Sequence, residues 1–475
     1  MTLILFFPVL AALVILFLPQ EEVKVIRWTA LIASLVPFGL SVWLWMRFDS
    51  SASGFQFSEQ YPWYEAINST FHLGVDGLSL TMVLLTTLLT PLAILASFSI
   101  QDKVKAYMML FLFLETGMLG VFLALDLLIF FVFWEIGLVP MYFLINQWGS
   151  EKGERVLWGG IKMQARNYAS LKFMIYTMAG SLGLLLAIQM LGVLFQTYDL
   201  PLLYQKWNAL EGTVFGLSVS TVKTVAFWAF VVAFAIKVPV WPFHTWLPDA
   251  HTEAPTAGSM ILAGVLLKLG AYGFLRLVLP LYPLEAQRFA GALAFLAVMA
   301  IVFGAFAAYG QTDFKRLVAY SSVNHMGFVL LGIAAAAKVG MNNPDIALNL
   351  SKNIALNGAV LQMFNHGLSA AGMFFLVGVI YERRHTREIS EFGGLAHGMP
   401  VYATIFLVTT LASIGLPGMA GFVAELMILF GTFDSATLAH GRLLAVLAAT
   451  GVVLGAIYML WMYQRVFFGR RDNPK

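Results

Sequence analysis

The sequence predicts an all-α polytopic membrane protein with about 13 transmembrane helices. Its 475 residues are 60% hydrophobic and only 11% charged, whereas a soluble domain carries about 25% charged residues. A soluble chain of this length would form roughly three domains, each with a charged surface. The 28 basic and 25 acidic residues are too few to cover such surfaces. The chain is therefore expected to lie in a lipid bilayer.

Apolar stretches recur along the whole chain, and each is close to the ~20 residues that a helix needs to cross the hydrocarbon core. They lie at approximately 3–19, 28–46, 78–100, 106–124, 127–147, 168–195, 221–246, 255–279, 287–309, 317–337, 353–381, 400–432 and 442–467. The longest connector, 47–77, is predicted to turn at the membrane surface. No connector is long enough for a separate soluble domain.

Two of the stretches contain helix breakers. Stretch 221–246 has Pro239 and Pro242 directly after Lys237, and stretch 400–432 has Pro417 between two glycines. Proline removes a backbone hydrogen bond and clashes with the preceding turn. Irregular backbone at membrane depth is tolerated only where it faces protein or water.

Broken helices five stretches apart are typical of an inverted repeat of five helices. We therefore expect two such repeats, each with a discontinuous helix and each forming a proton half-channel. The expected division is three N-terminal helices at 1–105 with the outer loop 47–77, the repeats at 106–279 and 287–467, and a cytoplasmic tail at 468–475.

The distribution of basic residues predicts the orientation, because cytoplasmic loops are enriched in Lys and Arg. With the N-terminus outside, the inner loops and the tail receive most of the 28 Lys and Arg. Among them are Lys103, Lys105, Lys152, Arg155, Arg383, Arg384, Arg470 and Arg471. The C-terminus is therefore expected in the cytoplasm, most simply at the inner membrane of a bacterium.

The candidate functional residues are five charged residues that lie inside apolar stretches. They are Glu115, Glu135, Lys237, Lys268 and Glu425. One charge at a helix centre costs about 2.5–3.5 kcal/mol, so five cost roughly 12–18 kcal/mol before any pairing. Structural ion pairs between helices are the simpler explanation, and a proton or ion path is the functional one.

Acids that precede lysines favour a proton relay. Burial disfavours the charged form of both groups, so both can exchange protons near neutral pH. Movement of Glu135 relative to Lys237 would switch the lysine between holding and releasing its proton. His244, His325 and His366 suit the role of supporting groups in such a relay, since histidine exchanges protons near neutral pH.

Each histidine also has a less specific explanation. His325 and His366 can be hydrogen-bonded core residues or, less simply, axial ligands of a haem. His244, Asp249, His251 and Glu253 include metal-ligand types, but their spacing fits no standard zinc pattern. Helix capping or proton entry explains this group more simply. We expect this chain to bind no metal and no cofactor of its own.

Composition excludes several other classes. The chain has no cysteine, which excludes disulfides, thiolate metal sites and a cysteine nucleophile. A formal net charge of +3, spread over short loops, gives no reason to expect nucleic acid as a partner.

Several long motifs resemble one known family. They are WEIGLVPMYF from Trp134, FAIKVP from Phe234, HTWLPDAHTEAP from His244, LAGVLLKLG from Leu262, SVNHMG from Ser322 and HGLSAAG from His366. Together they resemble the antiporter-like subunit M, or chain 4, of proton-translocating NADH:quinone oxidoreductase (respiratory complex I). Glu425 after the second break is similar to the M-type chain, whereas sister subunits and Mrp antiporters typically carry lysine there.

The resemblance implies a subunit of an enzyme that carries no redox centre itself. NADH, FMN, iron–sulfur clusters and quinone would belong to partner subunits, and L-type and N-type chains would flank this one in the bilayer. The family usually has a fourteenth helix, so one lateral contact is expected to differ here. The alternatives are a Mrp-type cation/proton antiporter subunit or a related hydrogenase or photosynthetic NDH membrane subunit. A solute transporter is disfavoured because the broken helices present Lys and Glu but no aromatic and polar cage for an organic substrate. A passive anchor would have no reason to bury five charges.

Overall fold

The computed structural model describes residues 1–156, 159–337 and 346–469, and the predicted all-α membrane fold is confirmed. Eleven helices in these ranges are long and apolar enough to cross a membrane. Three shorter apolar helices accompany them, namely α1 (Thr2–Phe17), α19 (Pro400–Ser413) and α20 (Ala420–Phe433). Every predicted apolar stretch overlaps one or more helices. The exact number of spans and the inverted repeat remain predictions.

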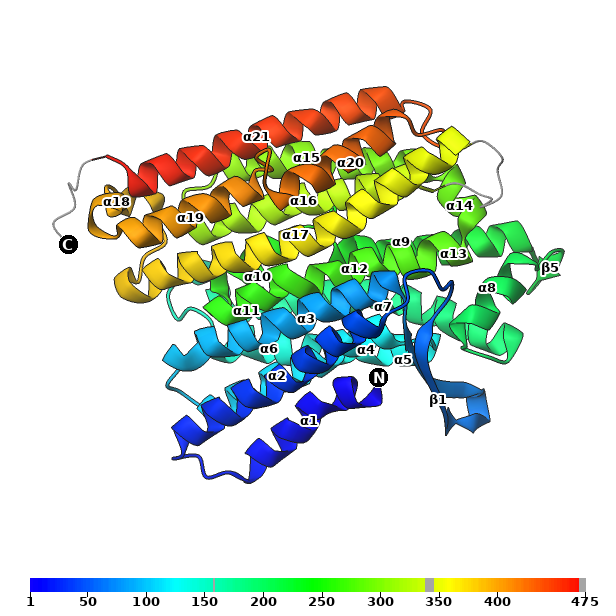
Figure 1. Ribbon diagram of the computed structural model, residues 1–475, viewed down its shortest axis with the longest axis horizontal. Coiled ribbons are helices and arrows are strands. Elements are labelled where there is room, and N and C mark those ends of the chain that lie inside the picture. Colours follow the sequence, from blue (N-terminus) through cyan, green and yellow to red (C-terminus); the bar gives the residue numbers. More distant parts are fainter. Residues whose placement is uncertain (157–158, 338–345, 470–475) are drawn as a thin grey trace. The chain divides into compact units, whose positions relative to one another are not determined.

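The described chain divides into two compact units. Unit 1 contains Met1–Lys237 and Glu253–Tyr282, and unit 2 contains Val238–Thr252 and Pro283–Lys475. The chain therefore leaves unit 1 directly after Lys237, returns at Glu253 and leaves again after Tyr282. Within each unit the long helices run side by side (Figure 1).

Unit 1 contains most of the helices of the N-terminal half. They are α1, α2 (Val23–Arg47), α3 (Gly77–Ala96), α4 (Val104–Leu123), α5 (Leu127–Ile136), α6 (Leu138–Trp148), α7 (Ala165–Phe195), α8 (Leu200–Asn208), α9 (Val219–Lys237), α11 (Thr256–Ile261), α12 (Leu267–Gly273) and α13 (Leu279–Leu281). Two π-helical segments, η3 (Leu262–Leu266) and η4 (Phe274–Val278), flank α12.

Unit 2 contains the remaining helices. They are α10 (Trp246–Glu253, whose last residue groups with unit 1), α14 (Pro283–Arg288), α15 (Ala290–Tyr309), α16 (Phe314–Ala335), α17 (Ile346–Arg384), α18 (Leu395–Gly398), α19, α20 and α21 (Gly441–Phe467). The predicted tail is described only as far as Gly469, and Arg470 and Arg471 lie outside the described residues. Single 3₁₀ turns lie at η1 (Glu65–Ile67), η2 (Ser97–Ser99) and η5 (Ile389–Glu391).

Three short antiparallel hairpins lie in the connectors within the described ranges, and the sequence had not indicated them. They pair β1 (Gln56–Tyr64) with β2 (Ser69–Val75), β3 (Glu154–Val156) with β4 (Lys162–Gln164), and β5 (Thr213–Val214) with β6 (Leu217–Ser218). The first occupies connector 47–77, and Leu73 of β2 also pairs with Ala124.

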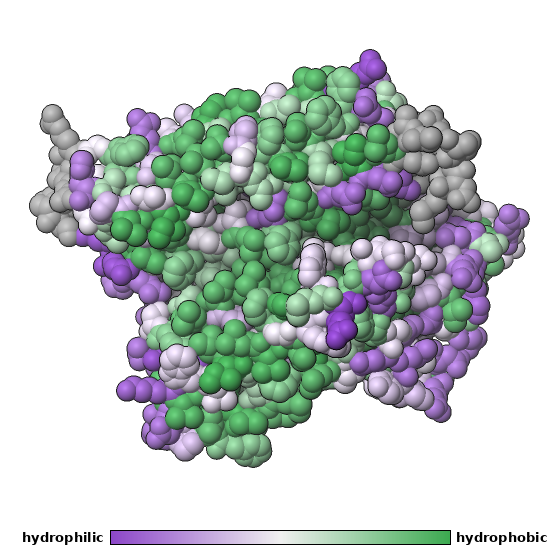
Figure 2. All heavy atoms as spheres, viewed as in Figure 1, coloured by the Kyte–Doolittle hydropathy of each residue, from purple (hydrophilic) through white to green (hydrophobic). Residues whose placement is uncertain are grey.

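Local sequence explains where the helices begin and how closely they pack. Asp76 caps α3 by accepting a hydrogen bond from the backbone N–H of Ser79, as N-cap carboxylates commonly do. In unit 2, a Cβ atom on Gly431 would lie 2.6 Å from Cβ of Ala355. Only small residues permit this approach of α17 and α20, which is the usual packing of helices in lipid. On the face that Figure 2 shows, apolar side chains gather over the helices of each unit.

Candidate functional site

Lys237 is the last residue of α9 and lies inside unit 1. Helix α9 ends here because Pro239 cannot continue it. The lysine side chain is almost completely buried, and its Nζ atom has no hydrogen-bond partner among the described residues. It lies 4.9 Å from the ring centroid of Trp134, a cation–π contact that offsets part of the cost of burial.

Glu135 follows Trp134 near the end of α5 and attracts Lys237 electrostatically. The structure thus brings together the two residues that the sequence analysis had paired. The indole N–H of Trp134 donates a 3.0 Å hydrogen bond to Ser181 of α7, and the Ser181 side chain also lies near the carboxylate of Glu135. Trp134 therefore contacts the lysine with its ring and the serine with its N–H.

The turn after Glu135 separates α5 from α6 at Gly137. A Cβ atom on Gly117 of α4 would lie 2.9 Å from the backbone of Gly137. Helix α4 therefore packs directly against the turn, and this contact fixes the position at which α5 presents Glu135.

Lys268 lies in α12, between the two π-helical segments, and is completely buried. Its Nζ atom donates a 2.5 Å hydrogen bond to the carbonyl of Ala263 in η3. A π-helical turn widens the backbone spacing and is frequent at functional sites. This segment of unit 1 therefore places a lysine and a non-standard helical turn together.

Glu115 is completely buried in the middle of α4. Within the part of the chain that the structure describes, neither of its carboxylate oxygens has a hydrogen-bond partner. A buried carboxyl group without hydrogen-bond donors is expensive, so Glu115 is a candidate functional residue rather than a packing residue.

In unit 2, Glu425 of α20 lies with polar side chains from two other helices. Its Oε1 atom is 3.1 Å from Nδ1 of His325 in α16 and accepts a 3.1 Å hydrogen bond from Nε2 of Gln362 in α17. Both Glu425 and His325 are buried. Three helices therefore meet at one carboxylate oxygen.

The predicted break in stretch 400–432 lies between α19 and α20. Gly415 and Gly418 adopt positive φ angles of +68° and +95°, which glycine accepts without a steric cost. The side-chain amide of Asn365 donates a 2.7 Å hydrogen bond to the carbonyl of Ala420 and so attaches α17 to the start of α20. The break faces the carboxylate of Glu425, since Gly415 is its close neighbour.

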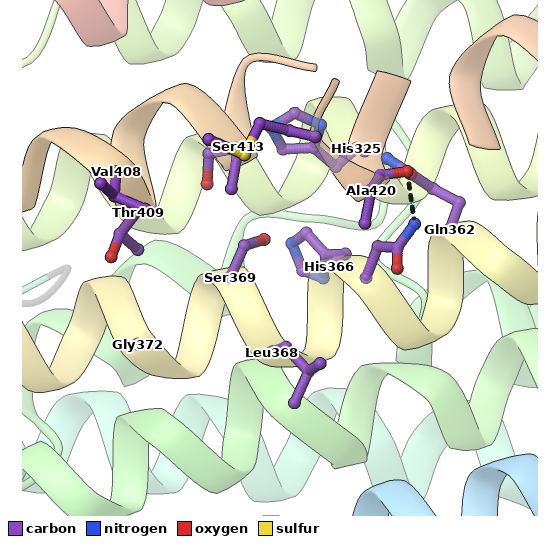
Figure 3. Close-up of a pocket in the computed structure, with 14 residues that line it drawn as sticks. His325, Gln362, His366, Leu368, Ser369, Gly372, Val408, Thr409, Ser413 and Ala420 are labelled. Atoms are coloured by element: carbon purple, nitrogen blue, oxygen red, sulfur yellow. Dashed lines mark hydrogen bonds between the residues drawn. The ribbon is translucent and has the colours of Figure 1, made fainter. Parts of the chain in front are cut away.

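A cavity of about 330 Å³ lies beside this break. His325, Gln362 and His366 line it together with hydroxyl groups from α17 and α19 (Figure 3). The rings of His325 and His366 are 5.7 Å apart between centroids. The cavity therefore connects a histidine pair with the polar groups around Glu425.

His244 follows the first break and groups with unit 2, where its ring lies 6.1 Å from that of Tyr320. Its neighbours in sequence have structural contacts: Asp249 lies 3.5 Å from Arg316, and the ring of His251 stacks on Phe374. Within the described ranges, no group of three or more His, Asp and Glu side chains is arranged to hold a metal ion.

The sequence analysis missed Ser181 and Gln362, which are uncharged partners of Glu135 and Glu425, and Asn365, which donates to the carbonyl of Ala420. It also missed Arg276, which lies in η4 and forms a 2.5 Å ion pair with Asp76. The signal for Arg276 was its position inside an apolar stretch. Polar residues such as Gln362 are common in helices, so no comparable signal marks them in the sequence.

Comparison with known proteins tests the family resemblance. The family model described as NADH:quinone oxidoreductase/Mrp antiporter, TM matches residues 124–455. NADH-quinone oxidoreductase subunit M of Rhodobacter capsulatus is 43% identical over 454 residues, which are 93% of this chain and 80% of that protein.

Two solved structures share the fold. A chain of respiratory complex I from Thermus thermophilus with bound NADH matches with a TM-score of 0.82 and 28% identity, covering 98% of this chain and 89% of that chain. A chain of the Mrp complex from Dietzia matches with a TM-score of 0.79 and 22% identity, covering 99% of this chain and 80% of that one. The resemblance seen in the motifs is confirmed, and the chain belongs to the NADH:quinone oxidoreductase/Mrp antiporter transmembrane family.

Proposed function

We propose that this chain is a proton-translocating membrane-arm subunit of NADH:quinone oxidoreductase. The observation that carries the proposal is the buried Lys237, which the half-buried Glu135 attracts electrostatically and which has no hydrogen-bond partner among the described residues. A buried lysine with a purely structural role is expected to have its N–H donors satisfied by hydrogen bonds. A lysine held only by one carboxylate and one aromatic ring is suited to changing its proton occupancy.

The comparisons favour the oxidoreductase over the Mrp alternative. The Rhodobacter relative named subunit M is 43% identical over most of both chains, whereas the Mrp likeness, at 22% identity, concerns the fold alone. The family motifs and Glu425 after the second break point in the same direction. NADH oxidation and quinone reduction belong to the enzyme of which this chain is one subunit.

In unit 1, we assign the proton-holding role to Lys237 and the modulating role to Glu135. A carboxylate near the ammonium group stabilises the protonated lysine, and its withdrawal leaves desolvation unopposed. Lys268 would hold the next proton. Its ammonium group would donate a hydrogen bond to the carbonyl of Ala263. Glu115 would be a supporting carboxyl group.

In unit 2, we assign proton exchange to Glu425. His325 lies within hydrogen-bonding distance of the carboxylate, and His366 lies next to His325. Protons would pass between water in the cavity, the two imidazole rings and Glu425. His244, which follows the first break and groups with unit 2, would be a further supporting group.

This assignment gives the chain protons as its substrate and no cofactor of its own. NADH, FMN, iron–sulfur clusters and quinone would lie in partner subunits, with L-type and N-type antiporter-like chains on either side in the membrane. We place the N-terminus outside and the C-terminus in the cytoplasm of a bacterial inner membrane, because of the asymmetry of Lys and Arg.

Purification through an affinity tag on this chain, followed by reconstitution into liposomes, tests the proposal. We expect flavin and iron–sulfur subunits to co-purify, and NADH with quinone to drive proton uptake or release across the liposome membrane. A complex that exchanges sodium for protons without oxidising NADH would instead identify a Mrp-type antiporter. A haem spectrum lost in His325→Ala would contradict the cofactor assignment.

A further inference from the structure

A cavity of about 390 Å³ lies in unit 1, at the end of the helices opposite the N-terminus of α1. Its lining residues come from the end of α1, the start of α2 and the start of α4. Its volume falls in the range of ligand pockets in proteins. None of the residues assigned to the proton path lines this cavity.

Lys103 and Lys105 are the charged side chains that line it among the described residues. Lys105 donates a 2.8 Å hydrogen bond to the carbonyl of Leu18, and Lys103 lies 3.4 Å from the side-chain oxygen of Gln147 at an exposed position. These contacts are with neutral oxygens, so both positive charges remain uncompensated by an acid at the cavity wall. The neighbouring acids Glu21, Glu22 and Asp102 are exposed and do not line it.

The backbone at the same place adds to the positive potential. Helix α4 begins at Val104 with no side-chain cap and no acidic residue in its first turn. The first N–H groups of a helix carry partial positive charge and attract anions. The residue that precedes α4 is Lys103. Its positive charge adds to the positive potential of the N–H groups.

The apolar part of the cavity continues onto the surface of α1. Leu16 lines the cavity and is 48% exposed, and Phe17 beside it is 85% exposed. Leu13 and Val14 extend this exposed strip along the helix. A free anion would use the lysines and leave the strip uncovered, whereas a molecule with an anionic head and an apolar chain would cover both.

We propose that this cavity binds the headgroup of an anionic phospholipid, with an acyl chain along Leu13, Val14, Leu16 and Phe17. The phosphate would accept hydrogen bonds from Lys103 and Lys105. In the orientation proposed above, this end of unit 1 faces the cytoplasmic leaflet, where basic pockets between helices bind anionic headgroups. The proposal concerns lipid binding and does not depend on the proton path.

A photoactivatable phosphatidylglycerol tests the site in the intact complex, reconstituted in nanodiscs of phosphatidylcholine. The labelled peptides are identified by mass spectrometry after illumination. We expect label near Leu16 and near Met109, which also lines the cavity. The double variant Lys103→Gln/Lys105→Gln should reduce this label about tenfold or more, since each basic side chain near the surface contributes roughly fivefold to anionic-lipid affinity.

Matched variants separate this effect from general loss of charge. Lys24→Gln/Lys162→Gln removes two lysines expected on the same membrane side that do not line the cavity, and it should leave the label unchanged. Lys103→Arg/Lys105→Arg should retain it. Both controls also show that the complex still assembles.

Three outcomes would overturn the proposal. Equal labelling by a photoactivatable phosphatidylcholine would show ordinary annular lipid. Loss of label in excess inorganic phosphate would show a site for free anions. No label at these peptides in any variant would show that a neighbouring protein chain covers the cavity.

Discussion

Gly415 lies directly against the carboxylate of Glu425. A Cβ atom on Gly415 would be 2.8 Å from Oε2 of Glu425, and the residue also has a positive φ angle of +68°. The break between α19 and α20 and the buried carboxylate therefore form one local arrangement. The glycine permits both the turn and the approach of the charged group.

The first prediction follows from this contact. Gly415→Ala should lower proton pumping because the new methyl group displaces the Glu425 side chain. Gly418→Ala is the matched control, since Gly418 has a φ of +95° and nothing within 4 Å of its Cβ position. Both changes place a Cβ atom on a residue with a positive φ angle, which costs about 1–2 kcal/mol. Gly415→Ala alone also displaces the side chain of Glu425. Equal pumping per NADH oxidised in the two variants would contradict the prediction.

The second prediction concerns Gln362, which donates a hydrogen bond to Glu425. A hydrogen bond to a charged group contributes about 1.5–3 kcal/mol, so Gln362→Leu should slow proton transfer through Glu425 about tenfold or more. Asn357→Leu, at an exposed position of the same helix, should have little effect. The measurement is the initial rate of pumping in liposomes. If both variants pump at the wild-type rate, Gln362 has only a packing role.

The third prediction concerns stability and pH. Burial alone would raise the pKa of Asp76, but the Arg276 guanidinium and hydrogen bonds from Ser79 outweigh burial, so the pKa lies below its ordinary value. A lowered pKa in the folded state stabilises the protein above the unfolded pKa of about 3.9, and this stabilisation is lost as pH falls through the folded-state pKa.

Asp76→Asn should therefore destabilise the solubilised complex at neutral pH by about 3 kcal/mol, because it leaves Arg276 buried without its partner. The difference from wild type should narrow in acid. Thermal unfolding followed at several pH values measures both effects. Asp49→Asn, at an exposed position, is the control, and a constant difference at all pH values would show that the ion pair is not responsible.

The fourth prediction concerns topology. A reporter fused after Lys475 should be active in the cytoplasm, because the inner loops carry most of the Lys and Arg. A second fusion in connector 47–77 should report the outer side. Activity of the C-terminal fusion on the outer side alone would reverse the assigned orientation.

Hydrophobicity and helix breakers predicted most of the fold. The apolar stretches coincide with helices because lipid requires satisfied backbone hydrogen bonds over a fixed length. Pro239 correctly marked the end of α9 at Lys237, and the glycines around Pro417 marked the break between α19 and α20. The β1–β2 hairpin was missed because its residues are polar and aromatic and their alternation is irregular.

Charge alone identified part of the candidate site. Glu135, Lys237 and Glu425 stood out because an ionisable residue in an apolar stretch is expensive. Their uncharged partners Ser181 and Gln362 did not stand out, because serine and glutamine do not carry the free-energy cost of a charged residue in an apolar stretch. The π-helical turns around Lys268 were also beyond prediction, because they depend on packing within unit 1 and not on a local residue pattern.

The coupling between Glu135 and Lys237 is the central claim, and a double-mutant cycle of proton pumping tests it most directly. Glu135→Gln, Lys237→Ala and the double variant are compared with wild type in the intact complex, at equal assembly and with NADH oxidation recorded in parallel. Each single change should lower pumping strongly. The double change should be far less than additive, because either one already disables the pair. Normal pumping at unchanged turnover in Glu135→Gln would show that the pair is structural and would contradict the account.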